Sequence, residues 1–157
     1  MRLKNQLRLK KIVSKLLKFL FLFFFFIVIR IFAFVDNQKL VLTVRGVSLS
    51  VELAVSEMNR QQGLMYRYKM DPNSGMLFVF DSSNHLTFWM KNTYISLDIL
   101  FLNENFVVKH IDTFTTPLSL KPIHSKFPAK YVLEVPAGFV LNNGVRIGDE
   151  ILLNIDE

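Results

Sequence analysis

The sequence contains no cysteine, which excludes disulfide bonds, cysteine nucleophiles, thiolate metal sites and anchoring through an acylated cysteine. Glycine and proline are few, at 6 and 5 of 157 residues, and no stretch of the chain resembles a linker or an internal repeat. Phosphate-binding glycine loops, dinucleotide fingerprints and Gly-x-Ser-x-Gly motifs are also missing. A folded domain in this chain must therefore be stabilised by its hydrophobic core alone.

Acidic residues are absent from residues 1–35, although this segment holds eight of the 19 Lys and Arg residues. Residues 36–157 hold the other 11 basic residues and all 13 acidic ones, so the net charge of +6 comes from the N-terminal segment. Nucleic-acid binding requires clustered cations that displace counterions from phosphates. The mildly acidic remainder of the chain therefore predicts no nucleic-acid partner.

The N-terminal segment combines a cationic stretch with an apolar run of 11 residues from Phe19 to Ile29. That length matches the core of a signal peptide better than a bilayer span, which needs about 20 residues. Arg30 then interrupts the run, and residues 31–35 extend the span only if the guanidinium snorkels to the interface. We expect residues 1–35 to be a signal peptide or an N-terminal membrane anchor. Cleavage near Ala33 and retention of the leader both remain open.

Lysine and arginine residues ahead of the apolar run also indicate how the chain is oriented. Cations that precede such a run predict a cytoplasmic N-terminus. The rest of the chain is then expected to be extracytoplasmic, or periplasmic in a bacterium, and either secreted or anchored in the cytoplasmic membrane. The membrane is thus an expected partner through the leader.

Residues 36–157 are expected to form a single domain in which apolar and polar residues alternate, most clearly over 47–55. Strands are predicted at 39–44, 47–55, 76–80, 86–91, 94–102, 106–112, 130–135 and 149–155. One short helix is predicted, capped by Ser56 and closed by Gly63. The pattern predicts an all-β fold, a mainly antiparallel sandwich or barrel of about eight strands with one short helix.

Residues 113–129 form a long connection without a clear strand pattern, and they contain three prolines. Long ordered loops of this kind are often functional. The alternative is that this connection merely covers an edge of the sheet.

The segment 86–99 suggests a candidate binding surface. If strands 86–91 and 94–102 pair through a four-residue loop, their apolar residues share the core face. The opposite face then carries Thr87, Trp89, Ser96 and Asp98, with Lys91 and Tyr94 at its rim. Such a set suits a small polar ligand, with the indole as a stacking surface. The alternative is that Trp89 packs under the long loop while Lys91 and Asp98 form a routine solvated ion pair.

Four segments occur in an order found in one protein family: 60–67, 75–80, 88–93 and 97–101. Together with 131–138 and 147–149, they make the chain resemble the domain of unknown function 192 (DUF192) family over about residues 40–155. The resemblance implies a compact, mainly antiparallel β fold, often behind a signal sequence, and it supplies no activity. The signature positions of the family add Arg60, Arg67, Asn92 and Glu134 to the candidate site.

The function expected from these patterns is a non-enzymatic module that binds a small polar ligand or a protein partner. The candidate ligand-binding residues are Thr87, Trp89, Lys91, Asn92, Tyr94, Ser96, Asp98, Arg60, Arg67 and Glu134. The alternative is an enzyme that uses Lys91 with Asp98 or Glu134 for proton transfer, which requires burial to bring their pKa values toward neutrality. No catalytic residue is assigned. No cofactor or metal is expected, because the methionines and the scattered His110, Asp112 and His124 make no recognisable metal-binding pattern.

Overall fold

The structure is a computed structural model that describes residues 15–21, 23–24 and 39–154. The chain divides into two compact units, Met1–Asn37 and Gln38–Glu157. In the first unit, the described residues 15–21 and 23–24 are helical. Among the described residues, no helix is both long enough and apolar enough to cross a membrane. The remainder of the expected leader, including Arg30 and Ala33, lies outside the described residues.

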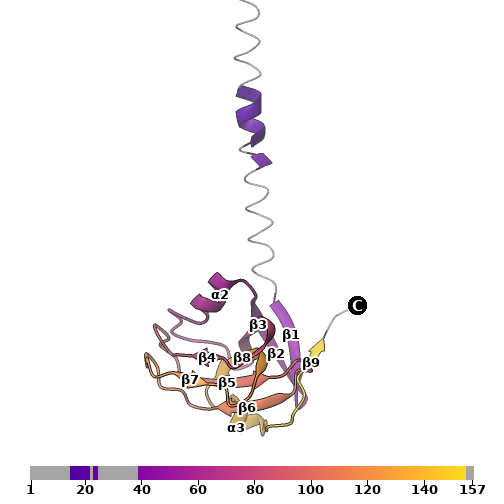
Figure 1. Cartoon of the computed structure of the whole chain (residues 1–157), viewed down its shortest axis with the longest axis vertical. Coiled ribbons are helices and arrows are strands. Elements are labelled where there is room, and N and C mark those ends of the chain that lie inside the picture. Colours follow the sequence, from indigo (N-terminus) through magenta and orange to yellow (C-terminus); the bar gives the residue numbers. More distant parts are fainter. Residues whose placement is uncertain (1–14, 22, 25–38, 155–157) are drawn as a thin grey trace, which may run out of the picture. The chain divides into compact units, whose positions relative to one another are not determined.

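The second unit consists mainly of β-structure, as the alternation of apolar residues predicted (Figure 1). Its strands are β1 (Lys39–Val44), β2 (Val47–Ala54), β3 (Ser74–Asn84), β4 (Thr87–Phe88), β5 (Leu97–Leu102), β6 (Val108–Asp112), β7 (Ile123–His124), β8 (Ala129–Pro136) and β9 (Leu152–Asn154). Its helices are α2 (Glu57–Gln62) and α3 (Phe139–Asn143). The all-β class is therefore confirmed, while β7 and α3 were not expected.

Seven of the strands form one sheet, in the order β6-β5-β8-β3-β2-β1-β9. β2 and β3 run parallel, and the other neighbours are antiparallel. The segment before β9 also bonds to the segment before β6, because Ile151 N–H donates to the Phe106 carbonyl at 3.0 Å. Gly148 N–H likewise donates to the Val108 carbonyl at 2.9 Å. These bonds link the two ends of the sheet, which curls into a half-barrel.

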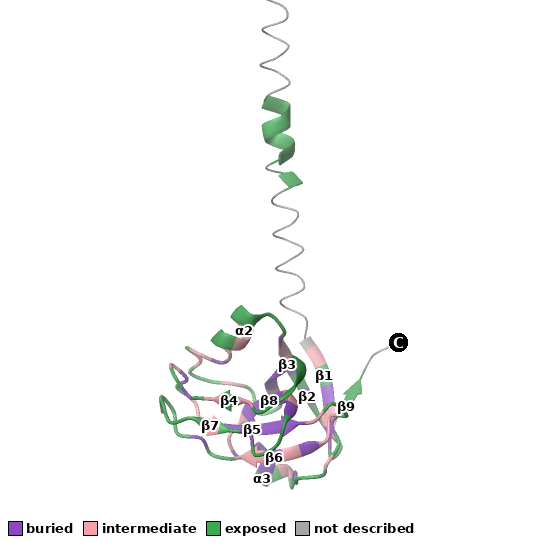
Figure 2. Cartoon of the chain, viewed as in Figure 1, coloured by how far each residue is buried: buried purple, intermediate pink, exposed green. Residues whose placement is uncertain are grey.

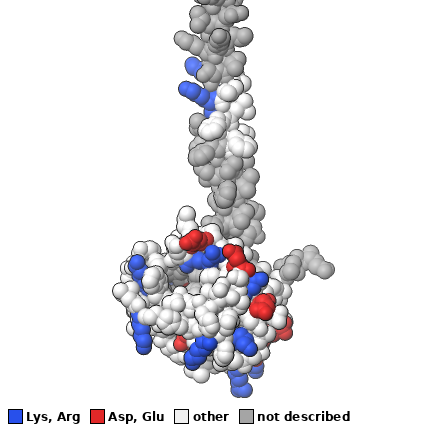
Figure 3. Space-filling view, in the orientation of Figure 1, with Lys and Arg blue, Asp and Glu red and all other residues white. Residues whose placement is uncertain are grey.

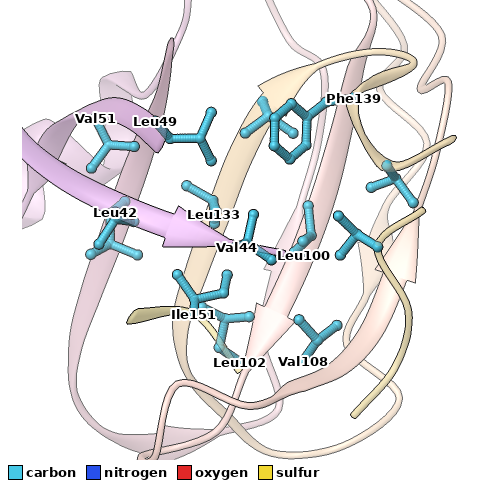
Figure 4. Packing of buried hydrophobic residues seen from close by; sticks show 14 residues of the cluster. Leu42, Val44, Leu49, Val51, Leu100, Leu102, Val108, Leu133, Phe139 and Ile151 are labelled. Atoms are coloured by element: carbon cyan, nitrogen blue, oxygen red, sulfur yellow. The ribbon is translucent and has the colours of Figure 1, made fainter. Parts of the chain in front are cut away.

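The concave face of this sheet encloses the main hydrophobic core (Figure 4). Successive side chains of a strand point to opposite faces, so Leu42 and Val44 of β1 lie beside Leu100 and Leu102 of β5 in one cluster. Helix α3 adds Phe139 and Val140 to the same cluster. Complete burial of such a side chain contributes about 1.5–3 kcal/mol, which explains how a domain without disulfides is held together.

A second cluster of buried residues covers the outer face of the central strands β3, β5 and β8. It includes Phe78, Ile99 and Val132, and the half-buried Phe88 of β4 packs against it. All six residues of β5 are therefore buried, on both faces (Figure 2). The outer face is the one on which the candidate site lies.

The predicted hairpin between residues 86–91 and 94–102 is wrong. β4 pairs instead with β7, through Thr87 opposite His124 and Phe88 opposite Ile123. Both edges of β5 are occupied by the longer strands β6 and β8, so β5 has no free edge to offer to β4. The connection 113–129 supplies β7 and lies along the segment that follows β4, where Met90 N–H donates to the Ser119 carbonyl at 3.0 Å.

Candidate functional site

A cleft of about 720 Å³ opens on the outer face of the sheet, beside α2 and β4. Its size falls within the range of about 300–1,000 Å³ that is usual for small-molecule sites. Side chains with charged or hydrogen-bonding groups line it together with aromatic rings: Glu57, Arg60, Thr87, Lys91 and Glu134 with Phe80, Phe88 and Trp89. On the face of the domain shown in Figure 3, charged groups of both signs surround a largely uncharged centre.

Glu134 is the polar residue of the cleft that is most deeply buried, with 4% of its surface exposed. It lies on the central strand β8, where its neighbours are Met76 of β3 and Ile99 of β5. Its carboxyl group forms no hydrogen bond or ion pair with any residue that the structure describes. Burial raises the pKa of Glu134 to about 8, so this carboxyl group is mostly protonated at neutral pH.

Two glycines of the family motifs allow the chain to approach closely around Glu134 and the cleft. A Cβ atom on Gly75 would lie 2.7 Å from the Glu134 carbonyl oxygen, so only glycine fits beside this part of β8. Gly63 has φ of +48°, and a Cβ atom there would lie 3.2 Å from the Phe78 ring. Gly63 ends α2 in a backbone conformation that other residues rarely adopt, and it brings the helix terminus against the aromatic wall of the cleft.

Helix α2 places Arg60 in the wall of the cleft. The helix starts as predicted, because Ser56 Oγ accepts a hydrogen bond from Asn59 N–H at 3.2 Å. Nη1 of Arg60 donates to the carbonyl oxygens of Val55 and Val79, and its guanidinium lies 5.1 Å from the centre of the Phe80 ring. Within the described part of the chain, all hydrogen bonds of Arg60 come from Nη1, so Nε and Nη2 remain available to a ligand.

Trp89 and Lys91 form the exposed part of the cleft. The Trp89 side chain is 53% exposed, and the Lys91 ammonium lies 5.5 Å from the centre of its ring. This exposure argues against the alternative in which Trp89 packs under the long loop. Thr87, which also lines the cleft, shares a 3.0 Å hydrogen bond with His124 Nδ1 across the β4–β7 pair.

Three other predicted residues lie near the cleft but make structural contacts instead of lining it. Asn92 Nδ2 donates to the Tyr66 hydroxyl at 3.0 Å, and the Tyr94 ring stacks on Tyr68 at 4.5 Å. Ser96 Oγ donates to the Thr115 carbonyl at 2.7 Å. These contacts hold the segment after β4 against the two connections beside it.

Asp98 and Arg67 point away from the cleft. Asp98 is completely buried on the face of β5 opposite to it, where its carboxylate accepts hydrogen bonds from Phe114 N–H at 3.0 Å and Val140 N–H at 2.9 Å. The expected surface shared by Trp89 and Asp98 therefore does not form. Arg67 pairs with Glu52 at 2.7 Å, and this hydrogen bond raises the pKa of Arg67.

Several cleft residues were not among the sequence candidates, namely Glu57, Gln61, Phe80 and Phe88. A signal for some of them was present, because Glu57, Arg60 and Gln61 follow the three- and four-residue spacing of one helix face. Among the described residues, no group of three or more His, Asp or Glu side chains is placed so that it could hold a metal ion.

Comparison with known proteins places these motifs in a wider context. The family model DUF192, described as "Uncharacterized ACR", matches residues 40–153. A protein from Sinorhizobium meliloti 1021, whose crystal structure is provisionally described as that of a transcription regulator, is 40% identical in sequence to this chain. The two structures superpose with a TM-score of 0.72, and the match covers 75% of this chain and 95% of that one. A protein of unknown function from Novosphingobium aromaticivorans DSM 12444 is 31% identical in sequence to this chain, with a TM-score of 0.71. That match covers 74% of this chain and 86% of the other. No curated protein matches the chain. The chain belongs to the DUF192 family.

Proposed function

We propose that the domain binds a small polar ligand in the cleft between α2, β4 and the outer face of the sheet. The observation that carries this proposal is Glu134, a buried carboxyl group that lines the cleft and has no partner among the described residues. Its oxygens are not fully enclosed, because among the described residues His110 Nδ1 is the only fully buried side-chain nitrogen or oxygen atom without a partner. A carboxyl group that has lost most of its water and has no protein partner is still costly. Such a cost is tolerated where a ligand supplies the missing partner.

The surroundings of Glu134 support a ligand site in two further ways. Arg60 and Lys91 bring unpaired hydrogen-bond donors to the same cleft, and Trp89 offers an exposed aromatic surface. The neighbouring residues Tyr66 and Asn92 both have positive φ, at 65° and 55°. They are held there by a 2.7 Å hydrogen bond from Tyr66 N–H to the Asn92 carbonyl. Positive φ also occurs at Arg45, Phe106, Phe114 and Leu118, which likewise do not line the cleft, so the donors and the aromatic surface carry the support.

Trp89 provides the test, because it is the only tryptophan in the chain. We expect a ligand found by screening polar metabolites to change its emission, and Lys91→Ala to weaken binding by about 1–3 kcal/mol through loss of a charged hydrogen bond. The urea midpoint should stay nearly unchanged, because exposed charges add little stability. Lys130→Ala is the matched control, since Lys130 lies over the Tyr131 ring outside the cleft. Equal affinities for both variants and the wild type would contradict the proposal.

Acid–base catalysis is the second candidate, and one observation favours it. A general acid or base works best when its pKa is close to the working pH, and burial brings the pKa of Glu134 to about 8. In this alternative Glu134 transfers the proton, with Lys91 in the same cleft, while Asp98 has no part because it lies on the other face of β5. Chemical conversion of a bound ligand that stops in Glu134→Gln would favour catalysis over binding.

We further propose that the domain works outside the cytoplasm, carried there or anchored by residues 1–35. The proposal rests on the lysines that precede the apolar run. A reporter enzyme that needs disulfides to fold, fused after residue 157, should be active, because disulfides persist only in oxidising compartments. The same fusion without residues 1–35 should be inactive. Activity of the shortened fusion would argue against export, and the size of the exported product would distinguish cleavage from anchoring.

We propose no nucleic-acid partner, although one similar structure is provisionally described as a transcription regulator. Residues 36–157 hold 11 basic against 13 acidic residues. Nucleic-acid affinity depends on clustered cations, and this charge balance does not favour it.

A further inference from the structure

Four charged or ionisable side chains line the cleft: Glu57, Arg60, Lys91 and Glu134. Glu57 is exposed and accepts a hydrogen bond from Gln61 at 3.1 Å, so it already has a partner at the surface. Arg60 and Lys91 contribute two positive charges. On the strands beside Glu134, the facing residues Met76 and Ile99 are uncharged. The cleft therefore offers two cations, one carboxylate at its surface and one deeply buried acid.

Glu134 forms no ion pair with either cation: among the described residues, no N–O distance within 4.0 Å joins its carboxyl group to Arg60 or Lys91. The pKa of Glu134 rises because of burial, and no nearby cation lowers it again. A cation within about 4–6 Å would favour the charged carboxylate. Arg60 and Lys91 line the same cleft as Glu134 without pairing with it, so a ligand that pairs with all three groups must carry both a cation and an anion.

Resting on the proposed binding function, we propose that the cleft selects an amphoteric ligand whose basic nitrogen meets Glu134 and whose anionic group meets Arg60 and Lys91. The aliphatic or aromatic part between these groups would lie along the Phe88 and Trp89 rings. Amino acids, short peptides and amino sugars with an acidic group all belong to this chemical class.

Other ligand classes satisfy the cleft less completely. A simple anion meets Arg60 and Lys91 but brings no cation to Glu134, whose carboxyl group then stays mostly protonated at neutral pH. A simple cation meets Glu134 but brings no partner for Arg60 and Lys91. A neutral polyol can hydrogen-bond all three groups, yet it offsets neither the desolvation of the acid nor the two positive charges. An isolated charge in a buried site is stabilised most by an opposite charge with good hydrogen-bond geometry.

Four probes with the same six-carbon chain test this inference on the full chain in mild detergent: 6-aminohexanoate, hexylamine, hexanoate and hexanol. Binding would be followed by Trp89 emission and by calorimetry. We expect 6-aminohexanoate to bind at least about tenfold more tightly than either singly charged probe, which corresponds to one lost charged contact. Hexanol should bind most weakly.

The pH dependence tests the contact with Glu134. An alkyl ammonium keeps its proton to about pH 10, so between pH 6 and 8 only Glu134 must ionise to form the pair. The affinity of 6-aminohexanoate should then rise by about 50-fold from pH 6 to pH 8, and level off about twofold higher above pH 8. Glu134→Gln should remove both this rise and the preference for the amine. Lys91→Ala should reduce the preference for the carboxylate, while Glu104→Gln and Lys130→Ala, which lie outside the cleft, should change neither.

Different outcomes would separate this inference from the proposed binding function. If hexanoate binds as tightly as 6-aminohexanoate and weakens above pH 8, Glu134 donates its proton to an anion and the amphoteric class is wrong. If none of the four probes binds while a neutral metabolite binds with dependence on Glu134, the ligand class fails but the site stands. If neither the probes nor the metabolite screen produces binding at the cleft, both proposals fail.

Discussion

Glu134→Gln is expected to make the protein more stable than the wild type at pH 8 and to leave their stabilities similar near pH 4. In the folded state burial raises the pKa of Glu134 from 4.5 to about 8. Below pH 4.5 the carboxyl group is protonated in both states, so its ionisation affects neither. Between pH 4.5 and 8 the unfolded chain releases the proton while the folded chain keeps it, so rising pH favours unfolding.

The size of this effect follows from the distance between the two pKa values. One pKa unit corresponds to about 1.36 kcal/mol, so the wild type should lose about 3–5 kcal/mol relative to Glu134→Gln across this window. Glutamine has the same shape and cannot ionise. Urea unfolding of both proteins at pH 4, 6 and 8 measures the difference, with the exposed Glu104→Gln as the control. Parallel stability curves for the wild type and Glu134→Gln would show that Glu134 ionises normally in the folded protein.

Asp98→Ala should destabilise the domain by about 2–5 kcal/mol. The Asp98 carboxylate accepts hydrogen bonds from the backbone N–H groups of Phe114 and Val140, and Asp98 is completely buried. Removing it leaves both donors without a partner, at about 1–3 kcal/mol each. It also releases the start of α3 and the beginning of the long connection from β5. The urea midpoint measures the loss.

Two variants make this prediction specific. Asp98→Asn keeps one acceptor oxygen, so a smaller loss is expected. Asp81→Ala removes an exposed carboxylate and should change the unfolding free energy by less than about 0.5 kcal/mol. Where Asp98→Asn still folds, it should bind cleft ligands like the wild type, because Asp98 lies on the opposite face of β5. A stability equal to that of Asp81→Ala would show that the two hydrogen bonds contribute nothing.

Local patterns in the sequence were sufficient for much of the domain. Alternation predicted β1 with its observed bounds and placed the long strands β2, β5 and β8 within a few residues. Ser56 and Gly63 marked the ends of α2, because capping and chain reversal depend on residues next to each other in the chain. Five of the ten candidate site residues line the cleft: Arg60, Thr87, Trp89, Lys91 and Glu134.

The predictions failed where they depended on which strands lie side by side in the sheet. The period of two shows which residues of a strand share a face, but it does not say which strand lies beside it or what covers each face. β5 was therefore paired with β4, and Asp98 was placed on a solvent-facing surface. In the structure β6 and β8 occupy both edges of β5, and α3 meets Asp98 from the opposite side.

By itself, the sequence determined the positive charge of residues 1–35, the all-β class, the family and the residues that alternate into the core. These properties depend on composition, on ordered motifs and on the two-residue period of a strand. Only the tertiary structure decided that Glu134 is buried without a described partner, that Arg60 reaches the same cleft and that Asp98 does not. Whether an ionisable group is buried and unpaired depends on segments that are far apart in the chain. Around Glu134 these segments are β3, β5 and α2, and no local sequence pattern shows that they come together.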